Sequence, residues 1–240
     1  MQTLPRLLQQ KTFYFAYFLF ALCFAFLLIC TSTKISCFVL LNTVHVKWLD
    51  VFFSIFTFLG DGIFSIAIAV SIFFIKKLRR LSIYIITAYL ISGITAQVLK
   101  RLFNAPRPKE ILDKHVYSFF IDGVTGSGWD SFPSGHTTSV FALATVLALY
   151  TNNKRWGTCF LLVAILVGYS RIYLGQHFLE DVVAGAVLGA ITGLLVYISG
   201  YMLRRAQRKT TGVSPVAADD FYGSRFAGNS IRRELLNQER

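Results

Sequence analysis

Long apolar runs recur along this chain and constrain its fold more than any other feature. A helix that rises 1.5 Å per residue needs about 20 apolar residues to cross a hydrocarbon core of ~30 Å. Only 15% of the residues are charged, whereas soluble domains carry roughly 25%. We therefore predict an all-α polytopic membrane protein with six transmembrane helices in one bundle.

The spans are expected between polar or basic breaks in this pattern. They are residues 12–30, 62–75 with an added turn, 81–99, 134–150, 157–169 and 181–202. Residues 48–58 place apolar side chains at helical spacing around Asp50 and Ser54, which favours an interfacial helix. Asp61 is expected to cap the second span. Glycine at 185, 189 and 193 in the last span indicates close helix packing.

Basic residues indicate how the chain is oriented. The run from Lys76 to Arg80 lies between the second and third spans, and Arg204 and Arg205 follow the sixth. Short loops rich in Lys and Arg stay in the cytoplasm. We therefore expect both termini in the cytoplasm, with residues 1–203 as the membrane domain. Residues 204–240 are expected to form a disordered cytoplasmic tail with a short helix at 231–238.

Charge and cysteine content narrow the function further. The net charge is +12, but many of the basic residues flank apolar runs, as membrane anchoring requires. A nucleic-acid partner is therefore not expected, since it would need a basic soluble face with stacking aromatic side chains. Cys30 and Cys37 both lie near the outer end of the first span, and their spacing leaves a disulfide open.

Three polar clusters interrupt the apolar chain. They are residues 100–108, the motif Pro133-Ser134-Gly135-His136, and Ser170-Arg171 with His177 and Asp181. Each cluster lies at the end of an apolar run, so the span count places all three at the outer face. Between them, the long polar loop 109–132 is expected to shape a substrate pocket.

The second cluster has the features of an anion site. A helix that opens near Pro133 presents unpaired N–H groups and a partial positive charge. Gly135 has no side chain to block an anion, and Asp130 or Ser131 is expected to cap the helix. The neighbouring clusters contribute Lys100, Arg107 and Arg171, which are suited to binding phosphate oxygens.

The third cluster supplies a nucleophile and its partner. If the sixth helix begins near His177, that residue and Asp181 share one face. The carboxylate would fix the tautomer of His177 and leave its other ring nitrogen free to attack. His136 could then protonate the leaving oxygen. Two His and one Asp could also ligate zinc or iron, but the three cations repel a dication, so no metal or other cofactor is expected.

These motifs resemble the signature of the type 2 phosphatidic acid phosphatase family, which shares its site with the vanadium-dependent haloperoxidases. That signature is K-x6-R-P, then P-S-G-H, then S-R-x5-H-x3-D, and the resemblance extends over about residues 50 to 200. The matching residues are Lys100, Arg107, Pro108, Pro133, Ser134, Gly135, His136, Ser170, Arg171, His177 and Asp181.

The resemblance implies a metal-free lipid phosphatase that works through a phosphohistidine. His177 would be the nucleophile, Asp181 its orienting group and His136 the general acid. The phosphate would be held by the remaining residues of the motifs. These are Lys100, Arg107, Ser134, Gly135 and Arg171. The implied substrate is a phospholipid, a polyprenyl diphosphate or a lipid A-type molecule, and the implied location is a bacterial inner membrane with a periplasmic site.

Two alternatives stay open. A lipid phosphotransferase could use the same phosphohistidine and pass the phosphate to a second lipid. An anion transporter is favoured by six spans and buried cations. However, the charged residues gather at one face and do not line a path through the midplane. The sequence does not choose among the lipid substrates or fix the oligomeric state.

Overall fold

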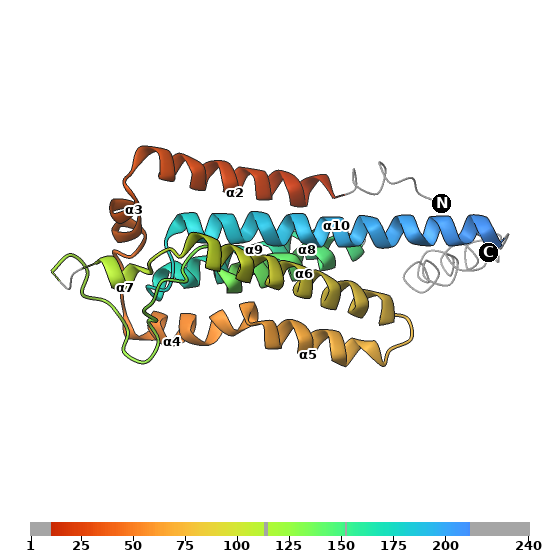
Figure 1. Cartoon of the computed structure of the whole chain (residues 1–240), viewed down its shortest axis with the longest axis horizontal. Coiled ribbons are helices and arrows are strands. Elements are labelled where there is room, and N and C mark those ends of the chain that lie inside the picture. Colours follow the sequence, from red (N-terminus) through yellow and green to blue (C-terminus); the bar gives the residue numbers. More distant parts are fainter. Residues whose placement is uncertain (1–10, 113–114, 152, 212–240) are drawn as a thin grey trace, which may run out of the picture.

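The protein is described by a computed structural model that covers residues 11–112, 115–151 and 153–211. These residues form helices and no strands, and most of the helices run along one long axis (Figure 1). The elements are α2 (Thr12–Thr31), α3 (Lys34–Leu41), α4 (Lys47–Phe56), the 3-10 helix η1 (Thr57–Gly60), α5 (Gly62–Phe73), α6 (Arg79–Phe103), α7 (Pro108–Ile111), α8 (Gly135–Tyr150), α9 (Lys154–Tyr173) and α10 (Leu179–Thr211). The predicted all-α class is confirmed for this part of the chain.

Four helices in the described residues are long and apolar enough to cross a membrane: α2, α6, α9 and α10. The segment Lys47–Gly60 and α5, which meet at a bend of 55°, would form a fifth span if they act together. The helix predicted to be interfacial is the first part of this bent pair. With 16 residues, α8 covers only ~24 Å and is too short to be counted by length. The protein is thus a multi-pass membrane protein, and the count of six spans stays a prediction.

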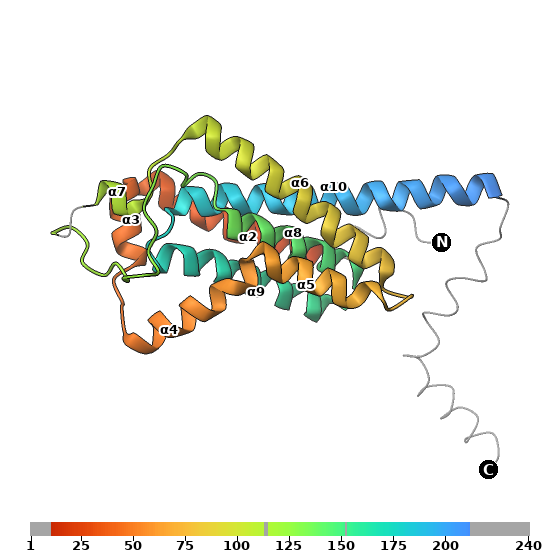
Figure 2. The ribbon, with the colours of Figure 1, turned by 60° about the horizontal axis from the view of Figure 1, so that its bottom comes forward.

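The short helix α8 lies at the centre of the bundle, against α6, α9 and α10 (Figure 2). Twelve of its 16 residues are buried. A helix that is apolar or small on all sides belongs in a protein interior. Its neighbours, rather than lipid, therefore surround most of α8.

α10 packs directly on the backbone of α8. A Cβ atom on Gly185, Gly189 or Gly193 would lie 2.6, 2.3 or 2.8 Å from the carbonyl oxygens of Ser134, Thr138 and Ala142, respectively. These distances leave room for hydrogen alone, so the close packing expected from the glycine spacing is confirmed. The contact begins at Ser134, which lies in the second polar cluster.

Several helix ends differ from the sequence-based boundaries. α6 ends at Phe103, before two prolines, and Asn104 adopts a left-handed conformation with φ of 42°. α9 continues through Ser170 and Arg171 to Tyr173. α10 continues to Thr211, past position 203, where we expected the membrane domain to end. The predicted cap is confirmed, because the side chain of Asp61 accepts the N–H of Ile63 at 3.0 Å. Residues 212–240, including the predicted helix at 231–238, lie outside the described residues.

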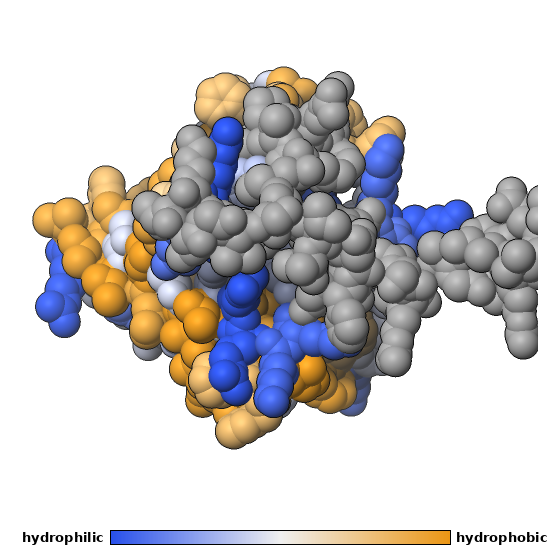
Figure 3. Space-filling view, turned by 90° about the vertical axis from the view of Figure 1, so that its right-hand side faces the viewer, coloured by the Kyte–Doolittle hydropathy of each residue, from blue (hydrophilic) through white to orange (hydrophobic). Residues whose placement is uncertain are grey.

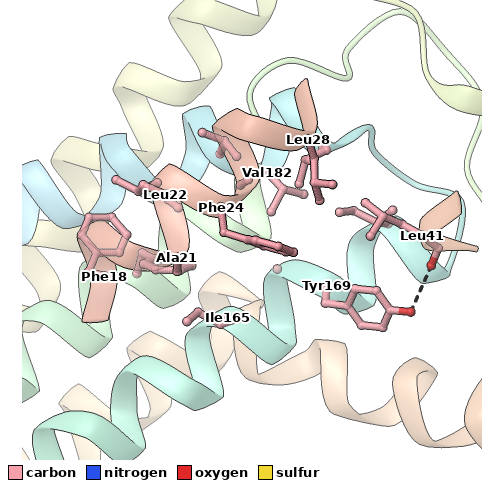
Figure 4. A pocket seen from close by; sticks show the side chains of 16 residues that line it. Phe18, Ala21, Leu22, Phe24, Leu28, Leu41, Ile165, Tyr169 and Val182 are labelled. Carbon is pink, nitrogen blue, oxygen red and sulfur yellow. Dashed lines mark hydrogen bonds between the residues drawn. The ribbon is translucent and has the colours of Figure 1, made fainter. Parts of the chain in front are cut away.

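α2 is the least buried of the four candidate spans, with 6% of its apolar window inside the protein. An apolar cavity of about 220 Å³ separates it from α9 and α10. Figure 4 shows Phe18 and Leu28 of α2 facing Ile165 and Val182 across this cavity. At one end the hydroxyl of Tyr169 donates to the carbonyl of Leu41 at 3.0 Å. The span is therefore only loosely packed against the bundle.

The disulfide that the sequence left open does not form. All four cysteines are free, with Cys30 exposed and Cys37 buried. Cys37 packs in an apolar cluster with Phe38 and Phe178. The connection between α3 and the bundle is thus held by apolar contacts in place of a covalent bond.

The two ends of the bundle differ in character. The connection between α5 and α6, which carries the basic run from Lys76 to Arg80, lies at the end where α10 finishes (Figure 1). Seen from this end, hydrophilic residues show below the middle and at the left edge, and hydrophobic residues lie to the left and below (Figure 3). α3, α7 and the start of α10 lie at the opposite end.

Candidate active site

The three polar clusters meet at the end of the bundle where α10 begins. Lys100 lies in the last turn of α6, and Arg171 lies in the last turn of α9. Ser134 is the N-cap residue of α8, and its backbone N–H donates to the carbonyl of Asp181 at 2.9 Å. His177 lies in the turn between α9 and α10. The helix ends thus bring residues from all three clusters together.

His177 is buried and its Nδ1 atom has two polar neighbours. Ser131 Oγ lies at 3.2 Å and Asp181 Oδ2 at 3.5 Å. The Ser131 hydroxyl donates to Asp181 Oδ2 at 2.6 Å, so its oxygen is left to accept the Nδ1–H of His177. This arrangement fixes the proton on Nδ1 and leaves the lone pair on Nε2.

The helical register of this pair differs from the expectation. α10 begins at Leu179, so His177 precedes the helix by two residues, yet its Nδ1 still lies 3.5 Å from Asp181 Oδ2. Asp181 turns back toward the loop, where its Oδ2 accepts the N–H of Phe178 at 3.0 Å. Ser131, which the sequence did not mark as a partner of either residue, joins the two.

The protonation state of His177 suits a nucleophile. Burial lowers the pKa of this imidazole to about 4, because desolvation disfavours the charged form. Asp181 acts in the opposite direction, and the cation of Arg171 adds to the lowering. The ring is therefore neutral at neutral pH and holds a lone pair.

Lys100 and Arg107 both contact Asp130. Arg107 donates from Nε and Nη2 to the two carboxylate oxygens at 2.8 and 3.3 Å. Its Nη1 donates to Gln176 Oε1 at 2.6 Å. Lys100 Nζ donates to the backbone carbonyl of Asp130 and lies 3.5 Å from its Oδ2. The hydrogen bonds from Arg107 lower the pKa of Asp130 to about 2, so this carboxylate is ionised at neutral pH.

Arg171 is the most deeply placed cation of the site. Its Nη1 donates to Thr57 Oγ1 of η1 at 2.7 Å, whereas its Nε has no hydrogen-bond partner in the described part of the chain. A buried charged donor without a partner is costly. Arg171 thus has a donor to spare for an anion.

The start of α8 remains open. A Cβ atom on Gly135 would meet no atom within 4 Å. Ser134 makes no capping bond, since its hydroxyl accepts from Thr137 at 2.9 Å. The prediction that Asp130 or Ser131 caps this helix was wrong, because both side chains bind other partners. The first-turn N–H groups are left for an anion, and His136 is half-buried in the same turn.

The described residues contain no cluster of side chains suited to bind a metal ion. Among residues 11–112, 115–151 and 153–211, no set of three or more His, Cys, Asp and Glu side chains is placed to hold a metal ion. The site therefore combines cations, one neutral imidazole held by Ser131 and Asp181, and an open helix start. This set can bind a tetrahedral oxyanion and attack it.

Known proteins are similar in sequence to this part of the chain. A family model described as the PAP2 superfamily matches residues 81–205, which include all three polar clusters. A lipid A 4'-phosphatase from Porphyromonas gingivalis is 32% identical over 206 residues, which cover 83% of this chain and 84% of that relative. A lipid A 1-phosphatase from Rhizobium etli is 35% identical over 116 residues, and the match spans 48% of each protein. An undecaprenyl-diphosphatase from Sulfolobus acidocaldarius is 30% identical over 121 residues, 48% of this chain and 53% of the relative.

Solved structures share the fold. The crystal structure of Aquifex aeolicus LpxE matches with a TM-score of 0.59 and 34% identity, over 68% of this chain and 93% of that one. A PAP2 type phosphatidylglycerolphosphate phosphatase from Bacillus subtilis matches with a TM-score of 0.58 and 24% identity, over 80% of this chain and 96% of that one. At that identity the Bacillus structure shows likeness of fold alone.

Proposed function

Since the chain belongs to the PAP2 superfamily, we propose that it removes the terminal phosphate of a membrane lipid through a phosphohistidine on His177. The substrate would carry a phosphate monoester or a diphosphate at the membrane surface. The names of the relatives favour a lipid A-type or polyprenyl diphosphate substrate, and a phospholipid is the third class that we consider. The reaction class is hydrolysis of a phosphoric ester or diphosphate.

One observation carries this proposal: His177 presents a neutral ring whose Nδ1 is held by Ser131 and Asp181, beside Lys100, Arg107 and Arg171. In the first step, Nε2 attacks phosphorus and the bond from phosphorus to the lipid oxygen breaks. His136, which is neutral before substrate binds, takes up a proton beside the bound phosphate dianion and donates it to that oxygen. Asp181 stabilises the positive charge that develops on the His177 ring.

In the second step, water replaces the lipid oxygen. His136, now deprotonated, accepts a proton from the water as it attacks phosphorus, and the bond from phosphorus to Nε2 breaks. Inorganic phosphate leaves, and the neutral His177 ring is restored. Throughout, five residues would bind the phosphoryl oxygens: Lys100, Arg107, Ser134, Gly135 and Arg171. The cations stabilise the charge on those oxygens in the transition state, so the chemistry needs no metal.

We propose that the site faces the outer side of the membrane. The basic run between α5 and α6 lies at the other end of the bundle (Figure 1), and such loops stay in the cytoplasm. In a bacterial inner membrane this places the site in the periplasm and both termini in the cytoplasm. Residues 1–203 would then form the phosphatase domain and residues 204–240 a cytoplasmic tail.

The experiment is phosphate release from a panel of lipid phosphates by the purified protein in detergent, with and without EDTA. We expect release that EDTA does not change and that His177→Ala lowers by at least about 10³-fold, as loss of a nucleophile does. His115→Ala, a change at an exposed loop histidine, is the matched control and should retain activity.

Each alternative has a distinct outcome. Loss of activity in EDTA would refute the metal-free mechanism, and full activity in His177→Ala would refute the nucleophile. Radiolabel that moves from the substrate to a second lipid, with no free phosphate, would identify a phosphotransferase. Anion uptake into proteoliposomes without any phosphate release would identify a transporter.

A further inference from the structure

Asp130 binds two of the cations to which we assigned the phosphate. Its carboxylate accepts Nε and Nη2 of Arg107 at 2.8 and 3.3 Å, and its Oδ2 lies 3.5 Å from Lys100 Nζ. A guanidinium binds a phosphate through the same two-pronged geometry. The remaining terminal nitrogen of Arg107 donates to Gln176. A phosphate that uses the Nε and Nη2 edge of Arg107 must therefore replace Asp130 or share that edge with it.

The two carboxylates of the site differ in how firmly they are held. The side chain of Asp130 is 56% exposed, whereas that of Asp181 is 1% exposed. Asp181 accepts from Ser131 and from the backbone N–H of Phe178, so it is fixed within the protein. Asp130 can turn into water, where a charged group is well solvated. Asp130 is thus the carboxylate that an incoming anion can displace.

The charges of the site favour that exchange. Before phosphate binds, Asp130 is the carboxylate paired with Lys100 and Arg107. A phosphate dianion at the same two cations places its own negative charge beside Asp130, and the repulsion is relieved if Asp130 turns away. Like charges at short range repel. Bound phosphate and a docked Asp130 therefore compete for Lys100 and Arg107.

We propose that Asp130 is an internal anion that occupies Lys100 and Arg107 when no phosphate is bound and competes with product phosphate for them. This inference rests on the function proposed above for the same site. Asp130 keeps the two cations in place between turnovers. After hydrolysis its return weakens the hold on inorganic phosphate, so product release is faster than three uncompensated cations would allow.

The test compares inorganic phosphate binding to Asp130→Asn and to the unmodified protein. Binding is measured from the rise of Tm with phosphate concentration in detergent, and from the inhibition constant of phosphate in turnover assays. We expect Asp130→Asn to bind phosphate about fivefold more tightly, which corresponds to ~1 kcal/mol, the upper range for an exposed ion pair. Asp122→Asn, at an exposed acidic residue of the same loop, is the matched control.

The sign of the change decides the matter. If Asp130 only orients Arg107, its loss weakens phosphate binding, and weaker or unchanged binding would overturn the proposal. Asp130→Glu keeps the charge and should stay near the unmodified affinity. Asp130→Ser also removes the charge and should likewise bind phosphate more tightly. It replaces Asp130→Asn if that variant does not fold. Tighter phosphate binding by a protein that hydrolyses no lipid phosphate would retain this inference and refute the proposed function.

Discussion

The contact between α8 and α10 can be tested with one methyl group. In Gly189→Ala, the new Cβ would lie 2.3 Å from the carbonyl oxygen of Thr138 and 2.9 Å from the backbone nitrogen of Ala142. Ordinary contact begins at 3.4 Å, so the closer pair is about 1.1 Å too short. Both obstructing atoms belong to the backbone of α8 and cannot rotate away. The helices must therefore separate at this point.

The expected cost follows from two opposing effects. Replacing glycine by alanine inside a helix stabilises it by about 1 kcal/mol through propensity. Overpacking a tight contact costs about 1–3 kcal/mol. Gly93→Ala in α6 isolates the first effect, because a Cβ at Gly93 would meet no atom within 4 Å. We expect Gly93→Ala to raise the Tm slightly. The Tm of Gly189→Ala should lie below the Tm of Gly93→Ala.

Activity should respond more strongly than stability. α10 carries Asp181, and α8 carries Ser134, Gly135 and His136, so separating the two helices moves the halves of the site apart. A displacement of about 1 Å in a catalytic group can cost about 10²-fold. The assay is kcat/KM for lipid phosphate hydrolysis, together with thermal unfolding in detergent. If Gly189→Ala matches Gly93→Ala in both measurements, the backbone contact does not set the geometry of the site.

Three further predictions concern the hydrogen bonds and protonation of the site. Ser131→Ala removes the hydroxyl that bonds to His177 Nδ1, and it should lower kcat about 10- to 100-fold with little change in KM, while Ser127→Ala at an exposed loop position should not. Thr57→Val removes the acceptor of Arg171 Nη1 and should destabilise the protein by about 1–3 kcal/mol, as seen in thermal unfolding; an unchanged Tm would contradict the bond. The folded pKa of His177, about 4, lies below the 6.5 of a free imidazole. The unfolded chain therefore binds more protons between these values, so stability is complete above pH 6.5 and falls as the pH drops toward 4. Denaturant titrations in detergent should show this loss, and His177→Gln should reduce it.

The sequence predicts the helices well and their ends less well. Apolar runs locate the membrane-crossing parts, but α9 and α10 continue beyond them with polar residues, because a helix need not end where the hydrocarbon ends. The bend between η1 and α5 lies at Asp61, the residue that the sequence marked as a helix cap. The sequence locates α8 but does not identify it as the central helix of the bundle, because the burial of a helix depends on which helices pack around it.

The site was predictable only where a motif marks it. The clusters containing Lys100, Arg107 and His177 stand out as polar groups at the ends of apolar runs. Asp130 and Ser131 were interpreted as helix caps because they precede the helix start. Their actual partners are far away in sequence: His177 is 46 positions from Ser131. Contacts of this kind depend on how the loop folds across the bundle, which local patterns do not encode.

The loose attachment of α2 has a consequence for how the protein adapts to different membranes. A span longer or shorter than the local bilayer relieves the mismatch by tilting. Only 6% of the apolar window of α2 is buried, and its first turn is attached to α8 by the hydrogen bond between Tyr14 and Thr145 at 2.8 Å, so the rest of α2 can tilt against lipid. It also precedes the segment at 81–205 shared with the superfamily. A mismatch in bilayer thickness can therefore be relieved in part by α2, without a change in the backbone contact of α8 with α10 that sets the distance between Ser134 and Asp181.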